Sequence, residues 1–353
     1  MPTLRSVSSL TSAALVAALT GCLAAPPAPA PSPEVSPEAT VEAAALFRAA
    51  CPDAARCGHD RFAPVLGSYM HYREAGDPHG PPIVLLHGQP TWSYLYRHII
   101  PRLPPEAHVI APDAIGYGLS GAPAIAYTWT DHVRYLGALL DQLDLHDAIL
   151  VVHDMGSFQG LAWAASHPDR VRGIVMMESL VQPLPSLDAL QFPPGSPGAD
   201  FADFLRVVKT DPPAAERLVV DDNIFLDHFL PALTVRALTA AERAAYAFPF
   251  RTRASRARLV TIPAGLPVAG APADNVAMVA GYARYLATSP VPKRIVYGER
   301  GLLFPPPVAQ ALAAALPATR AISVGDGLHF LQEDHPVEIA AEISALFREL
   351  HGR

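Results

Sequence analysis

The sequence is almost devoid of lysine. Lys209 and Lys293 are the only two, basic residues never occur more than two in a row, and the formal net charge is −7. Proteins that bind nucleic acid neutralise its phosphates with clustered Lys and Arg side chains. The charge distribution therefore argues against nucleic acid as a partner.

Cysteine is scarce as well, and so are grouped metal-binding side chains. Three cysteines occur in 353 residues, and only His59, close to Cys57, offers a further ligand nearby in the sequence. A protein zinc site takes at least three protein ligands. We therefore predict no metal site.

The apolar run near the N-terminus is too short to cross a bilayer comfortably, since it covers only residues 7–20. With Arg5 before it, this run has the pattern of a secretory signal peptide. It ends in Leu-Thr-Gly-Cys22, which resembles the lipid-modification signal of bacterial lipoproteins. We therefore predict a signal peptide at residues 1–21 and a lipid on Cys22. The globular part would then lie outside the cytoplasm at the cell envelope, on the outer membrane where the source has one.

Residues 22–61 are predicted to form a tether and an N-terminal extension. Pro, Ala, Ser and Glu dominate residues 24–42, a composition that cannot pack a core. If Cys22 carries lipid, Cys51 and Cys57 remain as a pair in an oxidising compartment. Five residues separate them (57 − 51 − 1), which leaves room for a bond. The pair is therefore a candidate disulfide.

From about residue 62 onward, short apolar runs alternate with segments of helical length. This alternation predicts an α/β fold with a mostly parallel central sheet flanked by helices on both faces. We expect helices over residues 92–103 and over residues 130–143, the second capped by Thr130. The buried-strand pattern recurs at residues 82–87, 108–113, 147–152, 170–178, 293–297 and 321–324.

Strand signals fade between residues 180 and 288, where helical stretches and prolines dominate. We interpret residues 180–288 as a helical cap inserted after the strand that ends at Glu178. The core is then formed by residues 62–179 and 289–353.

An acid at a strand-to-helix turn is the most informative feature. The strand predicted at residues 147–152 runs into Asp154, and a helix-length segment follows it. This arrangement is typical of the nucleophile elbow, whose central residue is most often Ser. A carboxylate at a helix N-terminus stays ionised and can attack carbon to form an ester. Taken alone, the same pattern also fits an Asp that caps an ordinary helix.

Two further segments can complete such a site. In HGQPT at residues 87–91, a strand ends in His-Gly and turns, which exposes the backbone N–H of Gln89 to pair with that of Met155 as an oxyanion hole. In GLHFLQED at residues 327–334, a loop carries His329 ahead of a helix that Asp334 can cap. His329 follows the nucleophile in chain order, as a general base of this arrangement does.

The acid that orients His329 has two candidates. Glu299 lies in the loop Gly-Glu-Arg-Gly after a later strand, with glycine where many hydrolases of this build carry the acid. Glu178 ends the strand that follows the Asp154 turn, at the carboxyl edge of the sheet where active sites of such folds lie. We therefore predict Glu178 as the orienting acid, with Glu299 as the alternative.

A glycine-rich motif, GYGLSG at residues 116–121, has to be considered as a dinucleotide site. Ala122-Pro123 follows it and blocks the helix that such a site needs, and no acidic residue closes a second strand about twenty residues on. We interpret this stretch as a loop.

Together these segments resemble the haloalkane dehalogenases of the α/β-hydrolase superfamily, and most of all the subgroup whose catalytic acid is a glutamate. The similarity runs from about residue 62 to 350 and extends to the phrases APDAIGYGLS at 111–120, LPVAG at 266–270 and SPVPK at 289–293. The same scaffold is similar to the coelenterazine-oxidising luciferase of sea pansies. The resemblance implies an α/β-hydrolase fold, a small halogenated or otherwise electrophilic substrate, and no metal or cofactor.

The resemblance also implies a role for each site residue. Asp154 displaces halide to give an alkyl-enzyme ester, His329 activates the water that hydrolyses it, and Glu178 steadies the imidazolium. The backbone N–H groups of Gln89 and Met155 would hold the oxyanion. Pro267 is placed at the halide site.

Two residues depart from the family pattern. Met155 replaces the usual Trp after the nucleophile, and Gln89 replaces the usual Asn after His-Gly. Both usual residues hold the leaving halide through a side-chain N–H, which Met lacks. Removing one donor from a known oxyanion hole costs about 2.7–4 kcal/mol, or roughly two to three powers of ten in rate. Trp92 is a candidate substitute donor; its other interpretation is packing between helix and cap.

Other functions remain open from the sequence. Epoxide opening by the same nucleophile needs hydroxyl donors from the cap, for which Tyr246, Tyr282 and Tyr285 are available, although the His-Gly-Phe-Pro form typical of epoxide hydrolases is absent. A cofactor-free monooxygenase like the luciferase is a second alternative. A non-catalytic envelope lipoprotein is a third, but a binding protein has no use for an Asp–His–Glu set.

Overall fold

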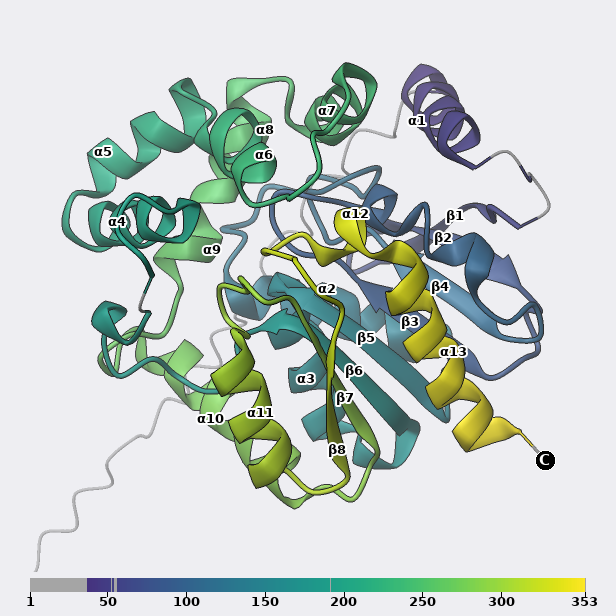
Figure 1. Cartoon of the computed structure of the whole chain (residues 1–353). Coiled ribbons are helices and arrows are strands. Elements are labelled where there is room, and N and C mark those ends of the chain that lie inside the picture. Colours follow the sequence, from purple (N-terminus) through teal and green to yellow (C-terminus); the bar gives the residue numbers. More distant parts are fainter. Residues whose placement is uncertain (1–36, 52, 54–55, 191, 353) are drawn as a thin grey trace, which may run out of the picture.

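The computed structural model in Figure 1 describes residues 37–51, 53, 56–190 and 192–352. The predicted signal peptide and Cys22 lie outside these residues. Within the described ranges, no helix has both the length and the apolar character needed to cross a membrane.

An eight-stranded sheet forms the centre, in the order β1-β2-β4-β3-β5-β6-β7-β8. The neighbours from β4 to β8 pair in parallel, whereas β2 pairs antiparallel with both β1 and β4 at one edge. This confirms the mostly parallel sheet. The strands are β1 (His59–Val65), β2 (Ser68–Gly76), β3 (Pro82–Leu86), β4 (His108–Pro112), β5 (Ala148–Asp154), β6 (Val171–Ser179), β7 (Lys293–Tyr297) and β8 (Thr319–Ser323).

Helices cover both faces of this sheet (Figure 1). Every position of β3, β4 and β7 is buried as a result, which is why the sequences of these strands are mainly apolar, although β4 begins with His108 and β7 with Lys293 and Arg294. The covering helices are α2 (Trp129–Gln142), α3 (Met155–Ser166), α10 (Ala273–Thr288), α11 (Pro306–Ala315) and α13 (Pro336–His351), with the short α12 (Leu331–Asp334) before the last.

A layer of short helices between β6 and β7 lies over one end of the sheet (Figure 1). We call this layer the cap. The predicted insertion also takes in α10, which packs against α3 and so covers the sheet. The cap contains α4 (Pro197–Thr210), α5 (Pro212–Glu216), α6 (Leu230–Ala232), α7 (Ala240–Ala247), α8 (Arg253–Ala257) and α9 (Thr261–Ala264), with π-helical turns at Arg217–Asp221 and Phe225–Phe229 and 3-10 turns at Leu187–Ala189, Phe248–Phe250 and Arg258–Val260.

Two local predictions are wrong. Residues 92–103 form two 3-10 turns, Ser93–Tyr96 and Ile100–Arg102, because Pro101 has no N–H with which to continue a helix. The cap residue of α2 is Thr128, not Thr130, since Thr128 and Asp131 exchange hydrogen bonds in a capping box.

A helix of the N-terminal extension, α1 (Pro37–Ala50), packs on the core. Its Phe47 ring lies edge-on to the Trp92 ring at 5.5 Å, and the guanidinium of Arg73 stacks 3.8 Å from its centre. The described part of α1 therefore packs on the folded body through Ala43 and Phe47.

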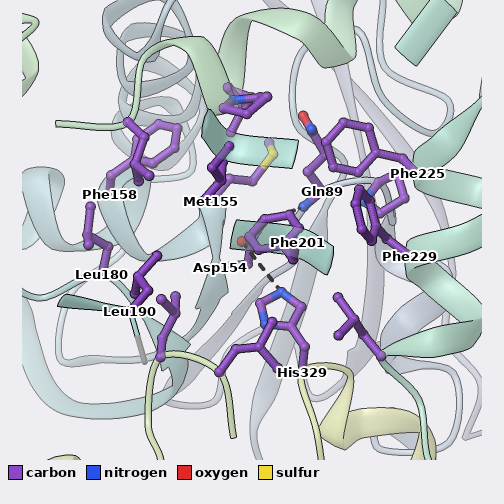
Figure 2. A pocket seen from close by; sticks show the side chains of 18 of the residues that line it. Gln89, Asp154, Met155, Phe158, Leu180, Leu190, Phe201, Phe225, Phe229 and His329 are labelled. Carbon is purple, nitrogen blue, oxygen red and sulfur yellow. Dashed lines mark hydrogen bonds and ion pairs between the residues drawn. The ribbon is translucent and has the colours of Figure 1, made fainter. Parts of the chain in front are cut away.

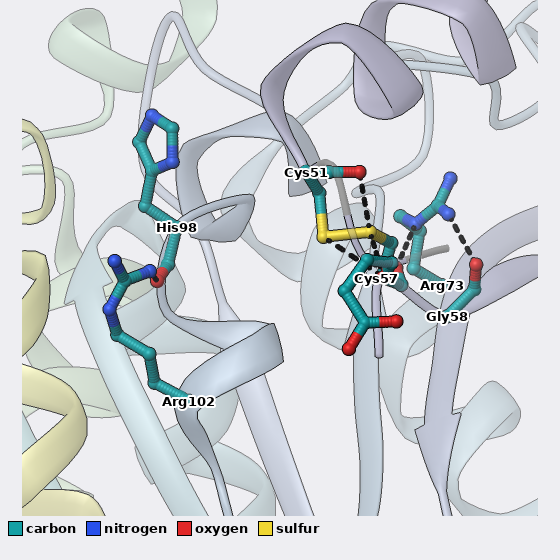
Figure 3. The surroundings of a disulfide bond; sticks show 7 residues. Cys51, Cys57, Gly58, Arg73, His98 and Arg102 are labelled. Atoms are coloured by element: carbon teal, nitrogen blue, oxygen red, sulfur yellow. Dashed lines mark hydrogen bonds between the residues drawn. A yellow bond between two sulfur atoms is a disulfide. The ribbon is translucent and has the colours of Figure 1, made fainter. Parts of the chain in front are cut away.

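Cys51 and Cys57 are joined in a disulfide in the loop after α1, as Figure 3 shows. Arg73 on β2 donates to the carbonyl oxygens of Cys57 at 3.2 Å and Gly58 at 2.6 Å, which fixes this loop to the sheet. The boundary predicted at residue 62 falls inside β1.

Candidate active site

Asp154 stands at the turn between β5 and α3 with a positive φ of 49°. Two glycines make room for this turn. A Cβ on Gly88 would lie 2.3 Å from Cβ of Asp154, and a Cβ on Gly156 would lie 2.4 Å from the carbonyl oxygen of Leu86. Because only glycine fits at either position, the chain can present the Asp154 carboxylate at the carboxyl edge of the sheet.

The Asp154 carboxylate has one contact on each oxygen. Oδ1 accepts a hydrogen bond from the backbone N–H of Gln89 at 2.7 Å, and Oδ2 lies 3.5 Å from Nε2 of His329 (Figure 2). Burial works to raise the pKa of Asp154, but the hydrogen bond and charge of His329 outweigh it and lower the pKa to about 2. The group is therefore ionised at neutral pH, as a carboxylate nucleophile must be.

His329 lies in the loop between β8 and α12. Its Nδ1 is 3.2 Å from Oε2 of Glu178, and its backbone carbonyl accepts a hydrogen bond from Nε2 of His153 at 2.9 Å. Burial works to lower the pKa of His329, but its contacts with Asp154 and Glu178 raise it to about 9. In the resting site an imidazolium thus lies between two carboxylates.

Glu178 is fully buried and held by the loop after β7. Its Oε2 accepts the backbone N–H groups of Leu302 at 2.8 Å and Leu303 at 3.0 Å, and its Oε1 accepts that of Phe304 at 3.0 Å. The alternative acid, Glu299, is exposed. In many hydrolases of this build the loop after β7 carries the catalytic acid. Here that loop supplies instead the backbone N–H groups that bind the Glu178 carboxylate.

An apolar cavity of about 90 Å³ opens beside these groups (Figure 2). Its apolar lining suits a small apolar molecule, although the cavity is smaller than the roughly 150 Å³ that holds benzene. Asp154, Met155 and His329 line it from the core. The cap contributes aromatic rings, from Phe192, Phe201, Phe225 and Phe229.

Few polar side-chain atoms reach the cavity, and the nitrogens other than those of His329 already have partners. The amide nitrogen of Gln89 donates to the carbonyl of Leu259 at 3.0 Å, and the indole nitrogen of Trp129 donates to that of Ile262 at 3.0 Å. Met155 has no donor to add. The side chains around the cavity therefore give a departing anion little hydrogen-bonding support.

Neither Trp92 nor Pro267 lies at the cavity, so the donor hypothesis for Trp92 and the placement of Pro267 at the halide site are wrong. The indole of Trp92 is fully buried and donates to the carbonyl of Ala245 at 3.0 Å, which fits the packing interpretation. Pro267 does not line the cavity; its carbonyl accepts the N–H of Leu184 at 2.9 Å, and Pro263 lines the cavity instead.

Smaller expectations around the site have mixed outcomes. The carboxylate of Asp334 does not cap the following helix but accepts the backbone N–H groups of Val235 and Arg236 in the cap. No sequence pattern predicts the direction of the cap rings either, although phenylalanine is frequent between residues 192 and 229. Residues 116–121 form a loop, as predicted.

The tyrosines considered for epoxide opening do not reach the cavity. Tyr246 donates its hydroxyl proton to Glu333, and Tyr282 donates to the carbonyl of Leu180 at 2.8 Å. Tyr285 is likewise absent from the lining. Within the described ranges, no three His, Cys, Asp or Glu side chains are arranged to hold a metal ion.

Comparisons with known proteins agree with this geometry. A family model described as alpha/beta hydrolase fold matches residues 81–336. A haloalkane dehalogenase from Bradyrhizobium diazoefficiens is 40% identical over 287 residues, which cover 80% of this chain and 92% of the relative. One from Mesorhizobium japonicum is 39% identical over 287 residues, covering 81% and 90%.

A solved structure gives the same result. The crystal structure of a putative ancestral haloalkane dehalogenase superimposes with a TM-score of 0.79 at 40% identity, and the match covers 83% of this chain and all of the other. The similarity therefore spans both the sheet and the cap.

Proposed function

This chain belongs to the haloalkane dehalogenase family, and we propose that it cleaves carbon–halogen bonds through a covalent ester on Asp154. The observation that carries this proposal is the contact of Asp154, His329 and Glu178 at the edge of an apolar cavity. A nucleophile, a base and an orienting acid are what a two-step displacement requires.

The first step is displacement of halide. One oxygen of the ionised Asp154 carboxylate attacks the halogen-bearing carbon, the carbon–halogen bond breaks, and the halide leaves with the electron pair. His329 is not needed as a base here, because no proton moves. The apolar lining of the cavity favours this step, because few polar groups stabilise the free carboxylate there.

The second step is hydrolysis of the ester. Esterification removes the negative charge of Asp154, one of the two charges that raise the pKa of His329, so the imidazole loses its proton more readily. Neutral His329 then takes a proton from water, which attacks the ester carbonyl carbon, and Glu178 stabilises the resulting imidazolium. The backbone N–H groups of Gln89 and Met155 are the proposed donors to the oxyanion. The tetrahedral intermediate then expels the alkoxide, which takes the proton of the newly formed carboxyl group and leaves as alcohol, so Asp154 is again a free carboxylate. His329 is left as the imidazolium of the resting site, and the one proton released per turnover is the one that it lost after esterification.

A test of the proposal uses a variant arrested after the first step. His329→Phe incubated with 1-bromobutane should release about one bromide per protein and gain the mass of a butyl group on the peptide that contains Asp154. Asp154→Ala under the same conditions is the control and should do neither. Absence of both halide release and adduct across chloro-, bromo- and iodoalkanes would refute the proposal.

We also propose that the mature protein is anchored to the cell envelope by a lipid on Cys22, its only contact with the membrane. The support is the sequence Leu-Thr-Gly-Cys22 and the Pro/Ala-rich stretch that follows. In a Gram-negative host fed an alkyne fatty acid, the wild type should be labelled and sediment with membranes. Cys22→Ala should be unlabelled, and equal labelling of both would refute the anchor.

A further inference from the structure

A buried cluster of charged side chains lies where cap and core meet, next to the His329 loop. At its centre Arg97, from the core, donates Nη1 and Nη2 to the two carboxylate oxygens of Glu333 at 2.6 Å and 2.8 Å. Both side chains are completely buried. Such a two-pronged pair in a buried setting holds its partners in one geometry.

The cap completes this cluster from its own side. Arg236 and Tyr246 each donate to a carboxylate oxygen of Glu333. Glu242 on α7 bridges the two arginines, accepting from Arg97 at 2.9 Å and from Arg236 at 2.7 Å. We call these five residues the Glu333 cluster. Every one of its charges has an opposite partner, so removing one leaves another unpaired.

The Glu333 cluster is tied directly to the loop that carries His329. Glu333 lies on α12, which begins two residues after His329 at the junction of cap and core (Figure 1). The backbone N–H groups of His329 and Phe330 both donate to the carbonyl of Leu233 in the cap, at 3.1 Å and 3.2 Å. The loop is therefore held by the cap at one point and by the Glu333 cluster a few residues on.

We propose that Glu333 is a positioning residue, which holds the His329 imidazole in line with the ester carbonyl by fixing α12 to Arg97 in the core and to the cap. This inference rests on the proposed function, since it assigns Glu333 to the second of the two steps. Glu333 touches neither substrate nor the reacting atoms, and it is absent from the cavity lining.

The two steps respond differently to a loosened loop. Attack by Asp154 uses no proton transfer, so it tolerates displacement of His329. Hydrolysis needs Nε2 within hydrogen-bond reach of the attacking water, where a misplacement of about 1 Å costs on the order of a hundredfold. A residue that only stabilises the fold would change both steps alike, through the amount of folded enzyme.

The test measures each step separately in single turnovers with 1-bromobutane. In Glu333→Gln, which keeps the shape and removes the charge, bromide release should stay within about threefold of wild type, while butanol formation slows at least about tenfold. Intact mass measured during turnover should show accumulated butyl ester. The single variant Tyr246→Phe keeps every charge of the Glu333 cluster and should retain most of the wild-type hydrolysis rate.

Controls separate the outcomes. Asp60 on β1 forms another largely buried ion pair, with Arg73 at 2.8 Å, away from the His329 loop. Asp60→Asn breaks this pair and should not alter the ratio of the rate constants for bromide release and ester hydrolysis. If Glu333→Gln fails to fold, the same two rate constants are measured in Arg97→Lys, which should likewise slow hydrolysis more than bromide release. An unchanged ratio in folded variants overturns the inference. Failure of His329→Phe to form any ester overturns the proposed function instead.

Discussion

Gln89 contacts Asp154 through its backbone N–H, at 2.7 Å from Oδ1, and not through its side chain. The amide of that side chain is bound at both ends, with Nε2 on the carbonyl of Leu259 and Oε1 accepting from the hydroxyl of Tyr117. The N–H faces the oxygen that becomes an oxyanion when water attacks an ester of Asp154. The site is thus better equipped for ester hydrolysis than for release of a halide.

Replacing Met155 by Trp should supply the missing donor at the leaving group. Because the side chain of Met155 lines the cavity, an indole N–H there can meet a departing halide. We expect alkylation by chloroalkanes to accelerate by roughly two powers of ten, and by iodoalkanes much less, since iodide needs less stabilisation. Pre-steady-state halide release measures both.

Met155→Phe is the matched control for that variant, because it adds an aromatic ring without a donor. Overpacking costs about 1–3 kcal/mol in either case, which the melting temperatures will report. An equal rate gain in the Phe variant would show that cavity shape, and not hydrogen bonding, limits halide release.

Glu178→Gln should slow ester hydrolysis by about two to four powers of ten. The amide cannot stabilise an imidazolium as a carboxylate does, and its NH2 group would face the backbone donors of Leu302, Leu303 or Phe304. The variant should also melt at a lower temperature. Glu299→Gln, at the exposed alternative acid, should leave hydrolysis unchanged, and a slow Glu299→Gln enzyme would reverse the assignment.

The stability that His329 contributes should depend on pH. Its pKa rises from about 6.5 in the unfolded chain to about 9 in the fold. Its ion pairs therefore stabilise the fold fully below pH 6.5, and this stabilisation is lost as pH rises through 9. The difference in melting temperature between wild type and His329→Gln should be largest near pH 6 and shrink toward pH 10.

Breaking the disulfide should lower stability and spare catalysis. A bond that closes a loop as short as that between Cys51 and Cys57 contributes about 2 kcal/mol through the entropy of the unfolded chain. The double variant Cys51→Ser/Cys57→Ser should therefore melt a few degrees lower. Its turnover at 25 °C should be unchanged, because the loop lies at the β1–β2 edge; a comparable loss of turnover would contradict this.

The sequence was sufficient for the six parallel strands β3 to β8 and for the residues brought together at their carboxyl ends, but not for the antiparallel edge that β1 forms with β2. In the sequence, parallel strands that are buried on both faces stand out as near-continuous apolar runs. The acid between such a strand and the helix α3 marks the sharp turn of a nucleophile elbow. Chain order and strand ends then placed Glu178 and His329 beside Asp154, because all strand ends in such a sheet converge on one edge.

The sequence failed where the answer depends on side-chain direction across the cap. Trp92 and Gln89 both bind carbonyls of cap segments far along the chain, Ala245 and Leu259, which no local pattern reveals. The Glu333 cluster is invisible for the same reason: its members come from the core, the cap and α12. Thr128 caps α2 because Asp131, three residues on, completes the capping box. The sequence-based prediction is the nearby Thr130 instead.

The most direct test of the covalent ester follows oxygen in a single turnover. Excess enzyme is mixed with 1-bromobutane in water enriched in oxygen-18, and the products are analysed by mass spectrometry. If Asp154 forms the ester and water attacks its carbonyl, the peptide that contains Asp154 gains one heavy oxygen and the butanol contains none. Heavy oxygen in the butanol, with an unlabelled Asp154 peptide, would show that water displaces the halide directly and would contradict the account.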